Sequence, residues 1–256
     1  MMSGDSAPLR TAFPRLVGRL IYFICLGVVV STIGLFPSAR CWAQQVVTVS
    51  PGDDLQSLVN AYPGNTKFEF TAGIYRLQSI VPKDNDQFVG LGGAILSGAA
   101  LLTSFSQSGS IWVSQVQVTG ASSYRGTCLA AFPLCTYPED LFFDNVLKQR
   151  VASSSAVGPG KWYLDYSTGK VYMGDNPSGH SVEISLLPHA FSGLGLNVII
   201  FDLTIEKYAS VAGDGAVNGT VSNGWGVEWC ELRYNHGLGI QSGNGMYILR
   251  CLAHNN

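Results

Sequence analysis

Three segments near the C-terminal end of the chain can be laid over one another. They span residues 197–205, 227–235 and 247–255. In each segment apolar residues alternate with polar ones, the alternation breaks at a polar or small pair, and it then resumes, as in a strand with one buried face that bends and continues. Leu232 and Leu252 superpose at an offset of 20. A repeat of this length is typical of a solenoid, whose stacked turns bury a core that no single turn can bury alone.

The N-terminal region has the pattern of an export signal. Three arginines precede an apolar run over residues 20–35, and Ala43 ends a Cys-Trp-Ala sequence with small residues at the two positions that a signal peptidase inspects. The run is short for a membrane span, and no stop-transfer segment follows it. We therefore predict a signal peptide over 1–43 and a secreted or periplasmic protein, with a retained N-terminal anchor as the alternative.

Charge and composition narrow the choice of partner. The predicted mature chain, 44–256, carries sixteen acidic and eleven basic side chains. This mild negative balance argues against a nucleic acid or an anionic membrane as a partner, because both need a basic surface. Only 12% of the whole chain is charged and it contains 30 glycines, which suits many short strands joined by tight turns. No later stretch is long and apolar enough to cross a bilayer, so we expect no membrane span after signal cleavage.

Four cysteines remain after the predicted cleavage. Cys128 and Cys135 flank a turn-rich loop, and we predict a disulfide between them in an oxidising compartment. Cys230 and Cys251 fall on successive turns one position out of register, so a bridge and two free buried thiols both stay open. Neither the cysteine spacing nor the four histidines follow a zinc-ligand pattern, and we predict no metal site from them.

The mature chain divides into three parts. Residues 44–107 read as short strands with one short helix, which Asp53 or Asp54 can cap. Residues 108–187 break the pattern and contain two aromatic strands joined across Gly169, which is a hairpin signal. Residues 188–256 return to the repeats. We expect the helix to cover the open end of the stack, and the middle part to be an inserted β-rich subdomain.

Several of these motifs carry a resemblance to a known family. Residues 49–58, Pro63-Gly64 and 72–77 resemble the opening of right-handed parallel β-helix proteins of the pectin-lyase-like type. Residues 137–144 and 160–172 are similar to exported bacterial β-helix-repeat proteins. The resemblance implies an all-β fold, a right-handed parallel β-helix with a short N-terminal capping helix and the inserted subdomain. It also implies a polysaccharide as substrate or ligand, although the superfamily includes lyases, hydrolases, epimerases, esterases and noncatalytic stalks.

Members of this family usually have more turns than the three or so that are visible after residue 190. The sequence stops at Asn256 inside a turn, with no closing helix or polar cap, which would leave the last strand edge bare. We therefore expect a C-terminally truncated version of a longer protein, and part of any catalytic groove to be missing from it.

Polar residues in the repeats suggest a chemistry. Offsets of 29 and 20 place Glu206, Asn235 and Asn255 in one column, and Lys207, His236 and Asn256 in the next. Strand alternation directs Arg233, Asn235 and Glu206 outward. Elimination from a uronate-containing glycan needs a cation at the sugar carboxylate and a base at the C5 proton. The resemblance motivates Lys207 or His236 as the base, Arg233 as the carboxylate clamp, Asn235 as a substrate contact, and Glu206 as an orienting group or a calcium ligand.

Other interpretations stay open. Hydrolysis by two carboxylates could use Asp202 with Glu231 or Glu206 with Glu228. A noncatalytic protein could instead stack a sugar on aromatic side chains of the hairpin, namely Trp162, Tyr163, Tyr166 and Tyr172, or these rings could only pack the insertion onto the turns. Asn235 and Asn255 could form a structural ladder from turn to turn, and the chain could be an inactive fragment of a longer enzyme.

Overall fold

The computed structural model describes residues 44–118, 127–130 and 133–256, and strands dominate this part of the chain. These residues fall in one unit, Ala43–Asn256. The predicted signal peptide, 1–43, lies outside the described residues. Within the described ranges, no helix has the length and apolar character needed to span a membrane.

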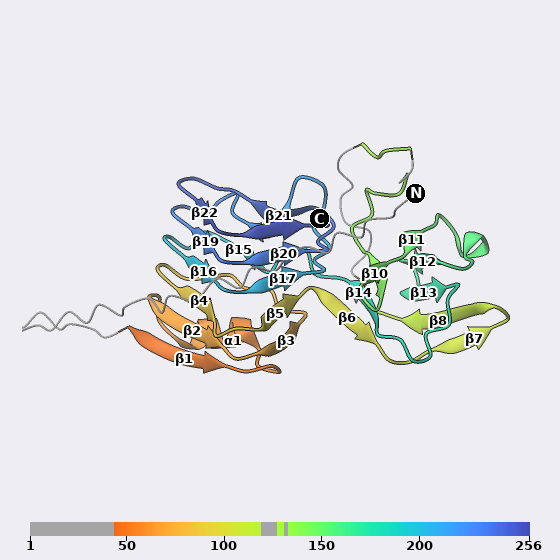
Figure 1. Cartoon of the computed structure of the whole chain (residues 1–256), viewed down its shortest axis with the longest axis horizontal. Helices are drawn as coiled ribbons and strands as arrows, with labels where there is room; N and C mark the ends of the chain where they lie inside the picture. Colours follow the sequence, from red (N-terminus) through yellow and green to blue (C-terminus); the bar gives the residue numbers. More distant parts are fainter. Residues whose placement is uncertain (1–43, 119–126, 131–132) are drawn as a thin grey trace, which may run out of the picture. The chain divides into compact units, whose positions relative to one another are not determined.

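Three parallel sheets contain most of the strands (Figure 1). The first consists of β1 (Gln45–Val49), β2 (Thr66–Phe70), β4 (Gln87–Gly90), β16 (Ile199–Phe201), β19 (Gly226–Glu228) and β22 (Tyr247–Leu249). The second consists of β3 (Gly73–Arg76), β5 (Ala94–Ser97), β17 (Thr204–Glu206), β20 (Glu231–Arg233) and β23 (Leu252–His254). The third consists of β15 (Phe191–Ser192), β18 (Gly215–Asn218) and β21 (Leu238–Gln241).

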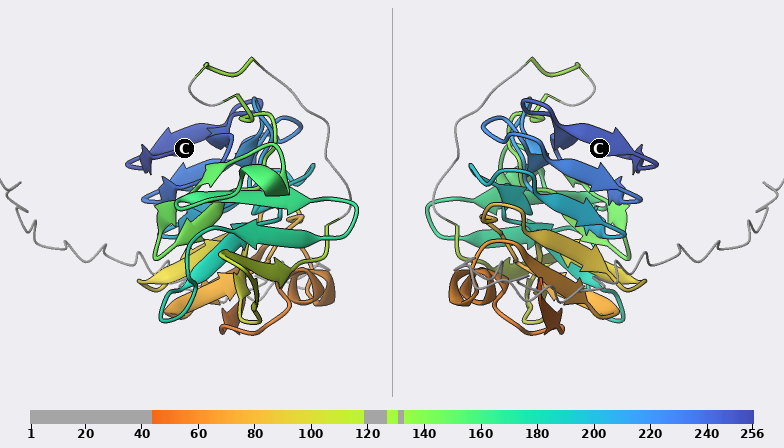
Figure 2. Two further views of the ribbon diagram at one scale, coloured as in Figure 1. Left: turned by 90° about the vertical axis from the view of Figure 1, so that its right-hand side faces the viewer. Right: turned by 90° about the vertical axis from the view of Figure 1, so that its left-hand side faces the viewer.

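The chain visits these sheets in a fixed order. From β16 it passes to β17 in the second sheet and β18 in the third, and it repeats this circuit with β19, β20 and β21 before β22 and β23. Each strand pairs in parallel with its counterpart one circuit earlier, as β17 does with β5 and β20 does with β17. Figure 2 shows the strands stacked in order, from the orange N-terminal strands to the blue C-terminal ones.

The register between circuits differs from the predicted one. Ile205 lies opposite Leu232, at an offset of 27, and Leu232 lies opposite Ala253, at an offset of 21. The predicted offsets of 29 and 20 are therefore wrong. A shift of one residue moves every side chain of a strand to the other face. Leu252, which is 60% exposed, therefore lies opposite Glu231 and not opposite the fully buried Leu232.

Loop lengths explain why the offsets are unequal. Eight residues separate β17 from β18, but only four separate β20 from β21. Seven residues join β18 to β19, and five join β21 to β22. Together these differences account for the change in offset from 27 to 21, so the repeat is regular in space although it is irregular in sequence.

Left-handed backbone positions mark equivalent corners of successive circuits. At one corner they are Asn197, Gly224 and Gly245; at the next, Asp202, Trp229 and Arg250; at a third, Lys207, Tyr234 and Asn255. All nine have φ between 53° and 71°. This region of backbone space turns the chain sharply and is sparsely used by residues other than glycine and asparagine. The corners therefore fix where each strand stops and the next begins.

A core of apolar side chains fills the space that the circuits enclose. Phe68 and Phe88 stack with ring centroids 5.2 Å apart, and Phe88 meets Phe191 edge to face at 5.0 Å. Helix α1 (Leu55–Ala61) adds Leu55 and Val59 to the same core. Asp54, one of the two predicted caps, accepts a hydrogen bond from the amide of Ser57 at 3.1 Å and begins this helix.

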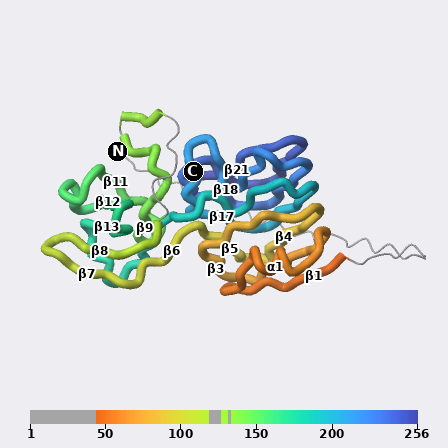
Figure 3. The backbone as a smooth tube through the Cα atoms, turned by 180° about the vertical axis from the view of Figure 1, so that it is seen from behind, coloured from red at the N-terminus to blue at the C-terminus, as the bar shows by residue number. Residues whose placement is uncertain are grey.

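An inserted segment interrupts one circuit between β5 and β15, and Figure 3 shows the chain leaving the parallel sheets at β6. It forms two further sheets. The first contains β6 (Ala99–Leu102), β9 (Leu141–Phe143), β10 (Val146–Leu147) and β14 (Val182–Ser185). The second contains β7 (Ser106–Ser108), β8 (Ile111–Gln115), β11 (Gln149–Arg150), β12 (Lys161–Asp165) and β13 (Lys170–Met173). The 3-10 helix η1 (Ser154–Ala156) lies between β11 and β12 in the chain. The aromatic hairpin expected across Gly169 is β12–β13, antiparallel with Asp165 opposite Lys170.

The insertion has its own apolar core. Trp162, Leu164, Val171 and Met173 come from the hairpin and are almost completely buried. Their alternation along β12 and β13 directs every second side chain inward, which is the pattern of antiparallel strands with one covered face. The insertion is therefore stabilised by packing of its own, and its edge elements are free to contact the circuits.

Candidate functional site

A cavity of about 580 Å³ lies between the insertion and the last two circuits. Its lining from the insertion consists of Pro133, Leu134, Cys135, Tyr137, Asp140, Phe142, Leu147, Lys148, Gln149 and Arg150. The circuits contribute Tyr234, Asn235, His236, Asn255 and Asn256. A volume in this range and a lining of aromatic and amide groups are typical of small-ligand sites.

The corner after β20 brings the circuit residues to this cavity. Tyr234 adopts a left-handed conformation with φ of 57°, which ends the strand and turns the chain. Its ring lies 5.9 Å from that of Phe142 in β9 and 6.3 Å from that of His254. As a result, His236 emerges facing the insertion, two positions beyond the corner.

His236 is held as a donor from both ring nitrogens. Its Nδ1 lies 3.0 Å from Asp140 Oδ2, and its Nε2 lies 2.6 Å from the carbonyl oxygen of Cys135. Burial lowers the pKa of His236, but the hydrogen bond and charge of Asp140, together with the Cys135 carbonyl, outweigh it and raise the pKa above its ordinary value. Both ring nitrogens are engaged by acceptor oxygens, so the base role that the sequence suggested for His236 would require one of these contacts to break.

Arg150 organises the opposite wall. Its guanidinium donates to Glu139 Oε2 at 3.2 Å and to the Tyr166 hydroxyl at 2.9 Å, and it lies 4.5 Å from the ring centroid of Tyr137. The Tyr166 hydroxyl donates to Glu139 Oε2 in turn. Burial raises the pKa of Tyr166, and the hydrogen bond to Glu139 adds to this effect against the opposing charge of Arg150. These contacts fix the Tyr137 ring at the cavity surface.

The two hairpin aromatics predicted as substrate contacts are placed differently from each other. Trp162 is fully buried, and its indole donates to the carbonyl of Lys148 at 3.2 Å. It therefore has no face for a sugar, because its ring belongs to the core of the insertion. Tyr166 stacks on Tyr137 at 5.9 Å and supports that ring from behind, whereas Tyr163 and Tyr172 face each other at 6.0 Å across the hairpin. The aromatic rings that border the cavity are those of Tyr137, Phe142 and Tyr234, none of which the sequence suggested as a sugar contact.

Asn235 is a structural residue. It is 1% exposed, its side-chain oxygen accepts from the amide of Tyr208 at 3.0 Å, and its side-chain nitrogen reaches the carbonyl of Ile205 at 3.2 Å. In the next circuit Asn256, and not Asn255, accepts from Asn235 at 3.0 Å. The outward orientation predicted for Asn235 is wrong, since the polar ladder at this corner satisfies backbone groups between circuits.

Lys207 and Glu206 are also buried, against the prediction that Glu206 faces outward. Lys207 is 1% exposed, forms ion pairs with Glu183 and with Glu206 at 3.4 Å, and donates to Asn145 at 2.6 Å. Because this ammonium group is buried between two carboxylates, it has no path to a bound glycan. Lys207 thus joins β17 to the insertion, through Glu183 of β14 and the turn before β10.

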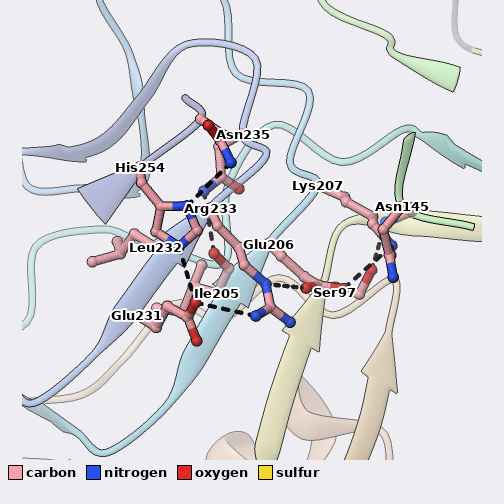
Figure 4. A network of polar contacts seen from close by, with 12 residues as sticks. Ser97, Asn145, Ile205, Glu206, Lys207, Glu231, Leu232, Arg233, Asn235 and His254 are labelled. Atoms are coloured by element: carbon pink, nitrogen blue, oxygen red, sulfur yellow. Dashed lines mark hydrogen bonds and ion pairs between the residues drawn. The ribbon is translucent and has the colours of Figure 1, made fainter. Parts of the chain in front are cut away.

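The same network extends across the second parallel sheet (Figure 4). Arg233 donates to Glu206 at 2.8 Å and to Glu231 at 3.1 Å, and His254 meets Glu231 at 2.9 Å. Burial lowers the pKa of Arg233, but the bond to Glu206 outweighs it and raises the pKa. Arg233 is therefore engaged by two carboxylates, and a third from a uronate would have to displace one of them.

The carboxylate pairs that hydrolysis would use do not line the cavity. Glu206 is committed to Lys207 and Arg233, and Glu228 accepts from the Tyr247 hydroxyl at 2.8 Å. In the observed register Glu231 lies opposite Thr204, so Asp202 and Glu231 do not share a column. The acidic side chain that does border the cavity is Asp140.

Cys128 and Cys135 form a disulfide with their Cα atoms 5.5 Å apart, and Cys135 borders the cavity. Among the residues that the structure describes, no group of three or more His, Cys, Asp or Glu side chains is placed to hold a metal ion. Cys230 and Cys251 are free thiols.

Sequence reasoning missed Asp140, Arg150 and Tyr137. Asp140 meets its partner His236 across 96 residues of sequence, so no local pattern connects them. One signal was present for the turn between β9 and β10, where Asp144 and Asn145 are both left-handed. An Asp-Asn pair between two apolar stretches favours a tight hairpin turn, and this turn places Asn145 against Lys207.

Comparisons with known proteins give two distant structural neighbours. No family model matches the chain, and no curated protein matches it. A solved structure described as the complex of XylC with xylose has a TM-score of 0.56 at 11% identity, over 70% of this chain and 37% of that one. A structure described as a glycoside hydrolase is 12% identical over 64% of this chain and 51% of that one, with a TM-score of 0.36. The first likeness concerns the fold alone, and the chain spans about 37% of XylC.

Proposed function

We propose that this chain is part of an exported right-handed parallel β-helix protein that binds a carbohydrate in the cavity between the insertion and the circuits. The parallel pairing of each circuit with the next supports the fold proposal. The carbohydrate proposal is supported by the xylose complex of the neighbour with TM-score 0.56, which is a property of that protein and here serves only as a motivation.

The observation that carries the proposal is the composition of the cavity. Tyr137, Phe142 and Tyr234 bring aromatic rings to the cavity, and Gln149 and Asn255 bring amide groups to the same space. Sugars are bound in proteins by stacking of their C–H faces on aromatic rings and by hydrogen bonds from amides to hydroxyl groups. Both elements are present within one cavity of suitable volume.

The electrostatics favour a neutral glycan over a uronate. Each cation bordering the cavity already has an anionic partner: Arg150 pairs with Glu139 at 3.2 Å, Lys148 pairs with Asp175 at 3.0 Å, and His236 pairs with Asp140 at 3.0 Å. A sugar carboxylate would therefore meet no uncompensated positive charge at these residues. Hydroxyl groups need only the amide and hydroxyl contacts that the cavity provides.

Binding also fits the geometry better than β-elimination. Elimination would draw its base and clamp from Lys207, Arg233 and His236, but Lys207 is buried between two carboxylates, Arg233 is paired twice, and His236 donates from both nitrogens. We therefore place this chain with noncatalytic carbohydrate-binding proteins, and we expect no rise in absorbance from unsaturated product with pectate or alginate.

A pair of adjacent surface positions provides the test. Leu147 and Val146 are both exposed on β10, at 55% and 60%, but only Leu147 borders the cavity. Leu147→Trp should fill the cavity and weaken binding of neutral oligosaccharides such as xylo-oligosaccharides by about tenfold or more, whereas Val146→Trp should leave affinity unchanged. Calorimetric titration of the full chain and both variants measures this difference.

The outcomes separate the parts of the proposal. Binding that both tryptophan variants retain would place the glycan elsewhere on the molecule. Tighter binding of oligogalacturonate than of neutral oligosaccharides would contradict the preference for a neutral sugar. An unsaturated product from any uronate polymer would restore the elimination hypothesis and overturn the noncatalytic assignment.

A further inference from the structure

Two cysteines far from the disulfide lie at the same point of successive circuits. Cys230 follows the left-handed corner residue Trp229, and Cys251 follows Arg250. The pairing of Glu231 with Leu252 puts the two cysteines in register, at an offset of 21. Neither residue borders the carbohydrate cavity, so the chemistry of this pair does not depend on the proposed function.

Backbone hydrogen bonds hold the two cysteines side by side. The amide of Leu252 donates to the carbonyl of Cys230 at 2.9 Å, and the amide of Trp229 donates to the carbonyl of Leu249 at the same distance. Neighbouring strands lie about 4.8 Å apart, which falls within the range of Cα separations that a disulfide spans. Thus no backbone movement is needed to bring the residues within bonding range.

The side chains have the same orientation. Cys230 Sγ lies 3.3 Å from the carbonyl oxygen of Glu228, and Cys251 Sγ lies 3.6 Å from that of Leu249, which is the equivalent atom one circuit later. Both thiols pack on the core that the circuits enclose. Each thiol also shifts the pKa of the other, as expected of two sulfur atoms held close together.

The two thiols differ in exposure and acidity. Cys230 is 2% exposed, whereas Cys251 in the last circuit is partly exposed. The hydrogen bond from Cys230 lowers the pKa of Cys251, against the effects of burial and of the nearby Glu228 carboxylate. The same hydrogen bond, together with burial, raises the pKa of Cys230. A partly exposed thiol with a lowered pKa beside a buried thiol is the arrangement of an attacking and a resolving cysteine.

We propose that Cys230 and Cys251 are a redox-active pair that closes to a disulfide by exchange with a low-molecular-weight disulfide such as glutathione disulfide. The Cys251 thiolate attacks one sulfur of that reagent, forms a mixed disulfide and releases one glutathione thiolate. The Cys230 sulfur, on losing its proton, then attacks Cys251 Sγ and expels the second. The two electrons reduce the reagent, and the two thiol protons end on two glutathione molecules.

The new bond would join the last circuit to the one before it. Strands β22 and β23 are mostly exposed, with Ile248 at 51% and Leu252 at 60%, so few apolar contacts hold them. A covalent link that closes the loop between the two cysteines removes much of the entropy that this circuit gains when it opens. Oxidation would therefore stabilise the last circuit against local unfolding.

Peptide mapping of the full chain tests the proposal directly. Trypsin cuts after Lys207, Arg233 and Arg250, so a bridge joins peptide 208–233 to peptide 251–256. After equilibration of the reduced protein with glutathione disulfide, we expect this linked pair at the mass of its two peptides less two hydrogens. Hydrogen exchange at residues 247–254 should slow by roughly tenfold or more on oxidation.

Matched variants distinguish this pair from the other disulfide. Cys230→Ser with Cys251→Ser should abolish the linked peptides and the slower exchange, whereas Cys128→Ser with Cys135→Ser should preserve both. Cys230→Ser alone should leave Cys251 as a stable mixed disulfide with glutathione. The proposal is overturned if the wild-type chain equilibrates with two separate peptides, whether Cys251 is unmodified or carries glutathione.

Discussion

The parallel circuits and the insertion solve the problem of burial in different ways. In the circuits each strand stacks on an equivalent strand, so apolar and polar side chains form columns, as with Ile205 and Leu232. In the insertion the strands are mostly antiparallel around a separate core, and edge segments bring Asp140, Arg150 and Tyr137 to the cavity. The comparison indicates that the circuits supply a scaffold and that the insertion supplies most of the side chains that can recognise a ligand.

The strongest test of this division concerns the buried ion pairs that join the two regions. Lys207→Met should lower the free energy of unfolding by about 3–5 kcal/mol, because it leaves Glu183 and Glu206 buried without their cation. Lys67→Met removes a partly exposed pair with Glu69 and should cost about 0–1 kcal/mol. Urea denaturation measures both, and equal losses would mean that Lys207 does not hold the regions together.

The columns within the circuits can be tested by truncating one leucine at a time. Leu232→Ala should cost about 2–4 kcal/mol, since Leu232 is fully buried in the core. Leu252→Ala should change stability by less than about 0.5 kcal/mol, because that side chain is 60% exposed. Comparable losses in thermal or urea unfolding would support the register with an offset of 20 and contradict the observed one of 21.

A smaller effect is expected from the contact between His236 and the insertion. The folded-state pKa of His236 is raised, so this contact contributes its full stability below the unfolded pKa of about 6.5 and loses it as pH rises through the higher folded value. We expect the wild-type chain to lose on the order of 1 kcal/mol of stability between pH 6 and pH 9 relative to His236→Gln. If the free energy of unfolding changes with pH by the same amount in both proteins, the imidazolium of His236 does not link the two regions.

The sequence predicted the presence of the repeating strands better than it predicted the register between successive circuits. Each of the segments 197–205, 227–235 and 247–255 contains two strands separated by a left-handed corner, as the broken alternation predicted, and the short helix and the hairpin across Gly169 are both present. Alternation is a local property that follows from burial of one strand face, so it can be read without partners. The offsets could not be read in this way, because loops of different length separate equivalent strands.

The candidate site was less accessible to sequence reasoning. Lys207, Glu206 and Asn235 are the residues that the pattern places on a polar surface, yet each is buried against a group from another element. Trp162 has the residue type of a sugar platform but fills the core of the insertion. A residue type and its strand position do not reveal whether a neighbouring segment covers it, and here the insertion covers the face that carries Lys207.

The amino-acid sequence by itself determined the short strands, a helix capped by Asp53 or Asp54, and the hairpin, because these depend on contacts within a few residues. The tertiary structure decided which residues of successive circuits pair, and it brought Asp140 to His236 and Glu183 to Lys207. Those pairs join residues 96 and 24 positions apart. Their charges are held together by burial between folded elements, which is a property of the assembled chain and of no single segment.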